Sequence, residues 1–537
     1  MGQRRTRVRF APSPTGPLHM GGVRTALYNY LYAKQHGGDF ILRIEDTDSH
    51  RFVPGAEEYI IEALRWCGIT PDEGVDADGK VVDTPSERHP HAPYRQSQRR
   101  GIYRRYAEEL VEKGYAYYAF DTPQELEAAR GAAEAAGGTF IYNQLSRGRL
   151  RNSLTLPEAE TKRLLAETTD WTIRFKMPED TLVEMDDLIR GHIEVNTATL
   201  DDKVLWKRAD ELPTYHLANI VDDHLMEISE VIRGEEWLPS LPLHYLLYRA
   251  FGWEDTMPRF AHLSLLLKPV GNGKLSKRDG DKMGFPVFPL RWTNAEGETS
   301  RGYREDGYFP EAFVNMLAML GWTPGDDREM FTLDELVEAF SLDKVQKAGA
   351  KFNPEKAKWY NKEYLRLKSD EELTSLFVPV LKAQGIAVTG CFESPVSCNF
   401  ETRSFSMSYV RNVIALTKMR ATFVADFWDI ARCLFEAPEC YNEKDAAKFW
   451  TEENSCLACE AADFLFHFGG DFTPEGIGGP LEEFIRGNEW PMGKVMNCLR
   501  LALTGASSGL GITDIVATIG KDELHARMEK IGKVLGK

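Results

Sequence analysis

The stretch that decides the fold is RFAPSPTGPLHMGGVRTALYN, residues 9–29. Residues 8–11 are predicted to form a short strand and residues 12–17 a Pro/Gly loop, and apolar side chains then recur with helical periodicity. Residues 40–44 are mostly apolar, as expected of a parallel strand that is buried on both faces. A strand, a helix and a second strand within about 40 residues indicate a βαβ unit, and therefore an α/β domain with a parallel sheet.

The same stretch contains a candidate phosphate site, because HMGG, residues 19–22, opens the helix. Backbone N–H groups and the dipole at a helix start attract anions, and glycines let a nucleotide approach the backbone closely. His19 is suited to donate a hydrogen bond to a phosphate oxygen as charge develops on it. A glycine turn with a capping histidine would explain the same four residues without any ligand.

A second candidate phosphate-binding stretch is KLSKR, residues 274–278, which is flanked by Gly273 and Gly280. Three cations on a glycine-rich loop suit a clamp that closes over ATP. Taken alone, the stretch is equally compatible with an ordinary solvated basic loop.

HMGG and KLSKR together resemble the two signature motifs of class I aminoacyl-tRNA synthetases, in the same order and with the interval interrupted by an insertion. Four further motifs are similar to those of the bacterial glutamyl-tRNA synthetase family: PSPTG (12–16), LRIEDTD (42–48) followed by Arg51, PTYHLANIVDD (213–223) and VIRGEEW (231–237). The resemblance is dense up to about residue 280 and weaker beyond residue 380.

The resemblance implies a domain organisation for the 537 residues. A Rossmann-like α/β catalytic domain with a parallel sheet is expected over residues 1–90 and 196–265. An inserted α+β domain that holds the tRNA acceptor end is expected over 91–195. A domain with the KLSKR loop and tRNA stem contacts is expected over 266–345, and an all-helical anticodon-binding region over 346–537.

The resemblance also implies ATP-dependent attachment of L-glutamate to the 3′ end of tRNA-Glu through a glutamyl adenylate, with release of AMP and pyrophosphate. The implied glutamate pocket comprises Arg9, Ser13, Glu45, Tyr215, Asn219 and Arg233. The two arginines are suited to grip carboxylates, and Glu45 to pair with the ammonium group. Without the resemblance, Arg9 with Glu45 reads as a salt bridge at a sheet edge, and Tyr215 with Asn219 as helix packing.

In the implied ATP site, Mg²⁺ would be bound by the phosphates of ATP rather than by a set of protein ligands. Its binding residues are Thr15, Glu236 and Trp237 together with the catalytic set His19, Gly21, Gly22, Lys274 and Lys277.

Transfer RNA binding is expected from local basic patches, because the formal net charge of the whole chain is −17. Residues 94–106 interleave five arginines with aromatic residues, and residues 344–368 contain seven lysines and one arginine against two acids. Such mixtures suit phosphate contact and base stacking, although a solvated helix face would also explain the lysines. The candidate tRNA contacts are Arg51, Arg99, Arg100, Arg147, Lys351 and Lys358.

Composition also bears on where the chain works. The eight cysteines are spread thinly along the chain, so we expect no disulfide bonds. This expectation is consistent with a protein of the reducing cytoplasm. No apolar run approaches the roughly 18 residues of a membrane span. We expect a cytoplasmic monomer.

Three features depart from the family pattern, and a fourth stretch matches the motif of an unrelated family. In the insertion, Ala119 and Asp121 stand where many relatives have zinc-binding cysteines, so no zinc is predicted. Asp210-Glu211 replaces Asp-Gly, so this turn is predicted to avoid positive φ. Residues 281–301 exceed the common pattern, and the sequence assigns them no role. TGASSGLG (504–511) matches a dehydrogenase cofactor loop, but too little chain follows for a dinucleotide fold, so a turn is predicted.

Four other functions are weighed against this one. A glutaminyl enzyme of the same subclass would lack PSPTG and have a β-barrel-like C-terminal half. A short paralogue that glutamylates a modified base would end before the helical region. A small-molecule adenylyl or nucleotidyl transferase would need neither the basic insertion nor the helical tail. An NAD oxidoreductase rests only on TGASSGLG.

Overall fold

The computed structural model describes residues 4–48 and 51–536. Internal contacts divide the chain into two compact units, Met1–Ala357 and Lys358–Lys537. Each unit has its own buried apolar core. Among the described residues, no helix combines the length and the apolar character needed to cross a membrane.

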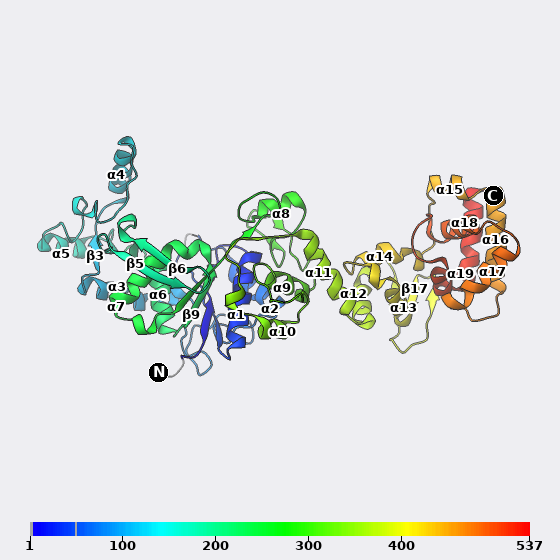
Figure 1. Ribbon diagram of the computed structural model, residues 1–537, viewed down its shortest axis with the longest axis horizontal. Coiled ribbons are helices and arrows are strands. Elements are labelled where there is room, and N and C mark those ends of the chain that lie inside the picture. Colours follow the sequence, from blue (N-terminus) through cyan, green and yellow to red (C-terminus); the bar gives the residue numbers. More distant parts are fainter. Residues whose placement is uncertain (1–3, 49–50, 537) are drawn as a thin grey trace. The chain divides into compact units, whose positions relative to one another are not determined.

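The centre of the first unit is the expected βαβ unit (Figure 1). Strand β1 (Arg7–Phe10) pairs in parallel with β2 (Asp39–Leu42), and helix α1 (Met20–Gln35) connects them. On the other side of β1, the Ser229 N–H donates to the Arg7 carbonyl oxygen (2.8 Å), which brings β9 (Glu230–Gly234) alongside. Strand β9 pairs in parallel with β10 (Arg259–Leu263). The predicted α/β class with a buried parallel sheet is therefore confirmed.

Helices cover this sheet. Helix α1 packs against α9 (Pro310–Ala318) and α10 (Leu333–Ala339), while α6 (Tyr215–Leu225) packs against α7 (Leu241–Phe251). Helix α2 (Ala56–Trp66) also contacts α1.

The chain between α2 and α6 forms an α+β region that lies toward the left of Figure 1. Its antiparallel sheet has the order β3-β4-β7-β8 (Ala116–Ala119, Thr172–Phe175, Val204–Lys207, Leu212–Pro213). Its helices are α3 (Arg100–Glu112), α4 (Pro123–Ala135) and α5 (Glu158–Glu167). The hairpin of β5 (Leu182–Asp187) and β6 (Gly191–Asn196) lies within the expected insertion by sequence, yet β5 pairs with β10 and so extends the central sheet.

The chain after β10 returns to the start of α1. Short strands β11 (Leu266–Leu267) and β14 (Ala350–Lys351) pair in parallel, and the KLSKR loop leads into α8 (Lys277–Met283). Residues 281–283 complete α8, and residues 284–301 form an irregular segment that ends in the small hairpin β12 (Trp292–Thr293) and β13 (Thr299–Ser300). Helix α11 (Pro354–Leu367) contains the division between the two units.

The second unit is helical, as expected, with one small sheet in addition. Its helices are α12 (Asp370–Ala383), α13 (Met407–Thr417), α14 (Asp426–Ala431), α15 (Glu443–Phe449), α16 (Glu452–His467), α17 (Pro474–Gly487), α18 (Met492–Thr504) and α19 (Ile512–Leu535). Its sheet has the order β15-β17-β16 (Ala387–Thr389, Ser404–Ser406, Cys398–Asn399). The TGASSGLG stretch is the turn between α18 and α19, as predicted, and Gly505 (φ 80°) ends α18 in the left-handed conformation.

One local prediction is wrong. Glu211 adopts a positive φ of 50°, although a residue with a Cβ was expected to avoid it. The turn joins β7 to β8, and the paired strands fix the path of the chain there. Tertiary pairing therefore outweighs the local cost of the left-handed conformation.

Candidate active site

A cavity of about 720 Å³ opens at the carboxyl ends of β1 and β9, where open α/β sheets usually bind ligands. The loop after β1, the start of α1, helix α6 and the KLSKR loop all contribute to its wall. It brings together nearly all residues that the motifs singled out: Arg9, Ser13, Thr15, His19, Gly21, Gly22, Glu45, Arg51, Tyr215, Asn219, Arg233, Glu236, Trp237 and Lys274. Lys277 lines a smaller neighbouring cavity instead, at the start of α8.

His19 is both a helix cap and a candidate phosphate donor. Its Nδ1 accepts the Gly21 N–H (3.1 Å), so the neutral ring carries its proton on Nε2. Nε2 is buried and has no hydrogen-bond partner within the described part of the chain. Burial, assisted by the charge of Lys274, lowers the pKa of His19 to about 4. A neutral imidazole with an unsatisfied N–H is therefore available to an anionic oxygen in the cavity.

Residues 281–301 pack against the start of α1. The Val287 carbonyl oxygen accepts the Met20 N–H (2.9 Å), and the Phe288 ring meets the His19 ring edge-on at 6.0 Å. Farther along, the Tyr59 hydroxyl donates to the Leu290 carbonyl oxygen (2.6 Å). This segment, which the sequence left without a role, thus ties the end of α8 to the helix start that carries HMGG.

Arg9 belongs to a buried charge cluster. Its Nε and Nη2 donate to the Asp223 carboxylate (3.0 and 3.2 Å). The fully buried Arg43 donates to Asp223 (2.7 Å) and to Glu45 (3.0 Å). Burial raises the pKa of Glu45, whereas Arg9 and Arg43 outweigh burial and lower the pKa of Asp223. In its preferred orientation the Asn219 amide bridges Asp223 (3.3 Å) and Arg9 (3.1 Å).

Arg233 has a different environment, because its partners are neutral. Its Nη1 donates to the Tyr215 hydroxyl (2.8 Å) and its Nε to His262 Nε2 (3.0 Å), while His244 Nδ1 lies 3.5 Å away. Tyr215 in turn stacks on Trp237, with ring centroids 4.1 Å apart. In the part of the chain that the structure describes, no carboxylate oxygen lies within 4.0 Å of the Arg233 guanidinium. Its charge is therefore free to pair with a carboxylate on a ligand.

Two partly buried, neutral histidines predict a loss of stability in acid. Burial lowers the pKa values of His19 and His216 to about 4 from the usual 6.5. The unfolded chain therefore takes up these protons first, and acidification favours unfolding between pH 6.5 and 4. Each such histidine contributes about 1.4 kcal/mol per pH unit in this window.

Urea unfolding across this pH window checks the expectation on wild type and on His216→Gln. The slope of unfolding free energy against pH should be shallower in the variant by about 1.4 kcal/mol per pH unit. Identical slopes would show that His216 does not titrate as its burial requires.

The predicted tRNA contacts fall into two groups. Arg100, Lys351 and Lys358 are exposed. Arg99 is buried, and its Nε donates to Asp222 (2.8 Å). Arg147 is also buried, and its guanidinium contacts Asp202 (3.2 Å) and the Met177 carbonyl oxygen (3.1 Å). In this structure the charges of both buried arginines are taken up inside the protein.

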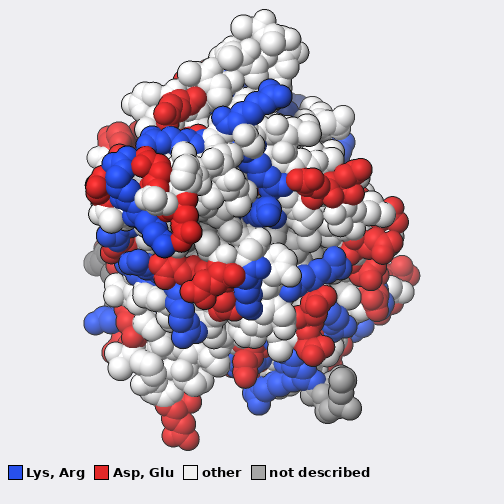
Figure 2. Space-filling model, turned by 90° about the vertical axis from the view of Figure 1, so that its left-hand side faces the viewer, with Lys and Arg blue, Asp and Glu red and all other residues white. Residues whose placement is uncertain are grey.

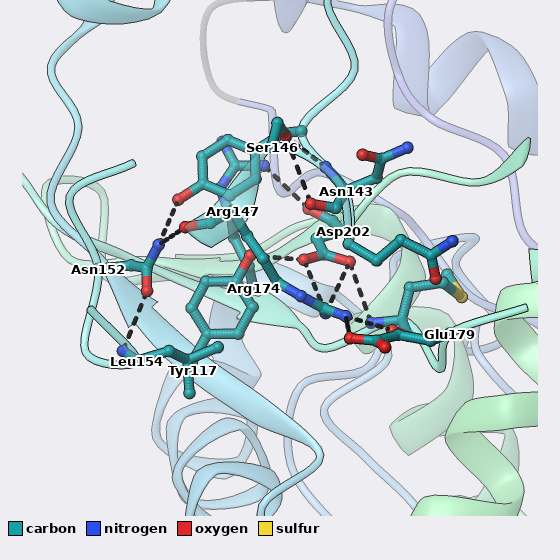
Figure 3. Close-up of polar contacts among 12 residues, drawn as sticks. Tyr117, Asn143, Ser146, Arg147, Asn152, Leu154, Arg174, Glu179 and Asp202 are labelled. Atoms are coloured by element: carbon teal, nitrogen blue, oxygen red, sulfur yellow. Dashed lines mark hydrogen bonds and ion pairs between the residues drawn. The ribbon is translucent and has the colours of Figure 1, made fainter. Parts of the chain in front are cut away.

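Figure 3 shows the network around Arg147 in the α+β region. The Asp202 carboxylate also accepts the Tyr117 hydroxyl (2.6 Å), and the Asp202 carbonyl oxygen accepts from Arg174 (2.9 Å). The Asn152 amide donates to the Arg147 carbonyl oxygen (2.8 Å). These bonds fix the loops of the region, and so Arg147 stabilises the fold.

The segment where relatives place zinc ligands is held in other ways. Ala119 packs in a small apolar cluster with Tyr117 and Tyr142. The Asp121 carboxylate accepts the Tyr142 hydroxyl (2.9 Å) and the Arg151 N–H (2.8 Å). Among the described residues, one group has the spacing of metal ligands, the exposed Glu184, His192 and Glu194 on the β5–β6 hairpin, and none of the three lines the cavity.

Figure 2 shows the end of the first unit that lies at the left of Figure 1. Acidic and basic side chains are interspersed on this face, and no broad patch of one sign covers it. Any nucleic acid bound there would depend on individual basic residues and on shape rather than on a uniform positive field.

Comparisons with known proteins agree with this geometry. Residues 5–359 match the family "tRNA synthetases class I (E and Q), catalytic domain", and residues 372–531 match "Anticodon binding domain". The chain is 53% identical to the glutamate–tRNA ligase of Porphyromonas gingivalis strain W83 over 99% of both chains. It is 52% identical to that of Bacteroides thetaiotaomicron over the full length of both. The crystal structure of a glutamate tRNA ligase from Elizabethkingia meningosepticum, in complex with its amino acid, is similar with a TM-score of 0.90 and 51% identity, covering 99% of this chain and 100% of the other.

The cavity, its two candidate phosphate-binding motifs and the family match define a class I aminoacyl-tRNA synthetase. Within that class, the full-length similarity shows that the chain belongs to the glutamate–tRNA ligase family. The helical second unit also disagrees with the β-barrel-like half that a glutaminyl enzyme would have.

Proposed function

We propose that this chain activates L-glutamate with ATP and transfers it to the 3′ end of tRNA-Glu, releasing AMP and pyrophosphate. The observation that carries the proposal is Arg233, a buried guanidinium held by neutral partners in the same cavity as HMGG. A ligand with a side-chain carboxylate would neutralise this charge, whereas an amide would leave it unpaired.

The reaction has two steps. The α-carboxylate of glutamate attacks the α-phosphorus of ATP, and the bond to pyrophosphate breaks. The ribose hydroxyl of the terminal tRNA nucleotide then attacks the acyl carbon and AMP leaves. The residues contribute orientation and charge stabilisation. His19 Nε2–H and the start of α1 face the phosphates, and Lys274 and Lys277 neutralise them from the KLSKR loop.

ATP supplies its own Mg²⁺ ligands through its phosphates in this proposal. Lys274 contacts Glu236 at 3.7 Å, and both side chains are about half exposed. An incoming triphosphate would compete with Glu236 for this lysine, so we infer that the loop moves toward ATP when it binds.

The exposed Arg100, Lys351 and Lys358, together with Arg51 at the cavity, are the candidates that we retain for tRNA contact. We further propose that the enzyme acts as a cytoplasmic monomer.

Aminoacylation with labelled glutamate on purified tRNA-Glu and tRNA-Gln separately tests the proposed function. Charging of tRNA-Glu alone would indicate a discriminating ligase. Charging of both would mean that a partner amidotransferase corrects the product. Charging of neither, with ATP still bound, would contradict the proposal and favour a small-molecule transferase.

Zinc is not part of the proposed enzyme, because Ala119 has no ligand atom and the hydrogen bonds of Asp121 to Tyr142 and Arg151 hold the segment without a metal. Metal analysis of the purified protein is expected to find far less than one zinc per chain, with full activity after dialysis against a chelator. Stoichiometric zinc would overturn this view of the segment.

A further inference from the structure

Three neighbouring strands place three buried polar side chains in one row. In the parallel pairing of β9 with β10, Arg233 lies directly opposite His262. Strand β10 pairs in turn with β5, which ends at Asp187. All three residues are buried. The motifs that resemble the family include Arg233 but neither His262 nor Asp187.

The hydrogen bonds along this row fix the protonation of the imidazole. Asp187 Oδ2 lies 2.6 Å from His262 Nδ1, and Arg233 Nε lies 3.0 Å from His262 Nε2. Since Arg233 Nε is only a donor, Nε2 has to accept, and Nδ1 then carries the proton that it donates to Asp187. The Asp187 carboxylate is held by the N–H groups of Ile189 (3.0 Å) and Arg190 (2.8 Å), so the whole row is anchored to the backbone.

This arrangement orients the Arg233 guanidinium without neutralising its positive charge. Arg9 shows the alternative, since its Nε and Nη2 both face the Asp223 carboxylate. At Arg233 an imidazole stands between the guanidinium and the nearest acid of the row. Burial lowers the pKa of His262, against the raising effect of Asp187, which agrees with a neutral ring.

We propose that His262, anchored by Asp187, is a positioning residue for the side-chain carboxylate of the amino-acid substrate. It fixes the plane of the Arg233 guanidinium through a neutral hydrogen bond and leaves the positive charge for the substrate. This inference rests on the proposed function, because it assumes that Arg233 binds the carboxylate of glutamate.

Two substitutions distinguish the roles of the two ring nitrogens of His262. In His262→Asn the amide is short and replaces Nδ1, so the contact with Asp187 is kept and the acceptor for Arg233 is lost. In His262→Gln the longer side chain places an oxygen near the position of Nε2, so the acceptor for Arg233 is restored. The control is His224→Gln, at a partly buried histidine of the first unit that stacks on Trp253 and does not line the cavity.

We expect His262→Asn to raise KM for glutamate about tenfold or more, while KM for ATP changes less than about twofold. In His262→Gln, KM for glutamate should stay within about threefold of the wild-type value, and in His224→Gln it should equal the wild-type value. An unchanged KM for glutamate in His262→Asn, or equal increases in the Asn and Gln variants, would overturn the proposal.

Asp187→Asn provides a second test if His262→Asn fails to fold. It keeps Oδ1 for the backbone N–H groups but turns an amide N–H toward His262 Nδ1, so the ring would carry its proton on Nε2 and no longer accept from Arg233. A rise of KM for glutamate alone is therefore expected, and an equal rise of KM for ATP would overturn the proposal. If wild type itself fails to charge tRNA with glutamate, it is the proposed function that fails.

Discussion

Replacing Arg233 by alanine is expected to lower kcat/KM for glutamate by roughly 10³-fold, while the affinity for ATP stays within about threefold of wild type. The guanidinium has no acidic partner among the described residues, so its removal strands no protein carboxylate. Its neutral partners, Tyr215 and His262, lose only a donor. The loss therefore falls on the ligand whose carboxylate the guanidinium would pair with.

Two variants make this expectation specific. Arg233→Lys keeps the charge but cannot reproduce the planar fork, and it should recover only part of the activity. Arg259→Ala removes an arginine at the start of β10 that pairs with Glu230 and is largely exposed, and it should leave kcat/KM nearly unchanged. Full glutamate activity in Arg233→Ala would refute the pocket assignment.

Contiguous motifs explain why so much of the cavity could be predicted from the sequence. HMGG, PSPTG and VIRGEEW each follow or end a strand of one parallel sheet, and the carboxyl ends of these strands meet at one edge. The residue types within each motif then indicated anion binding. What the motifs could not show was which side chains pair with one another inside the protein.

Those pairings join residues that are distant in the chain. Asp223 meets Arg9 across more than two hundred residues, and His262 meets Asp187 across 75. No local pattern shows such contacts. The sequence likewise could not show the internal partners of Arg99 and Arg147, two of the predicted tRNA contacts. The acids that pair with them, Asp222 and Asp202, lie 123 and 55 residues away.

The extra segment 281–301 shows a similar limit. Its sequence is polar and rich in loop-forming residues, which indicates only that it is irregular. Folded, it presents the Val287 carbonyl oxygen to the first N–H of α1 and the Phe288 ring to His19. It thus satisfies one of the free N–H groups at a helix start and narrows the space around the His19 imidazole.

His19→Asn is expected to lower kcat by about 10²- to 10³-fold with little change in KM for glutamate. The sequence left two roles open for this residue, a helix cap and a phosphate donor, and the structure shows that one ring serves the first role through Nδ1. Asparagine keeps that role, because its short side-chain oxygen is among the most favourable helix caps. It does not reach the position of Nε2, so only the donor is lost.

His19→Ala provides the comparison, since it removes the cap as well as the donor. The alanine variant should lose about 1 kcal/mol of unfolding free energy relative to the asparagine variant, while both should have similarly low kcat. Pre-steady-state measurement of pyrophosphate release and urea unfolding of both variants would separate the two effects. Near-normal kcat in His19→Asn would mean that the imidazole serves α1 alone, and that the start of the helix and the KLSKR lysines stabilise the phosphates without it.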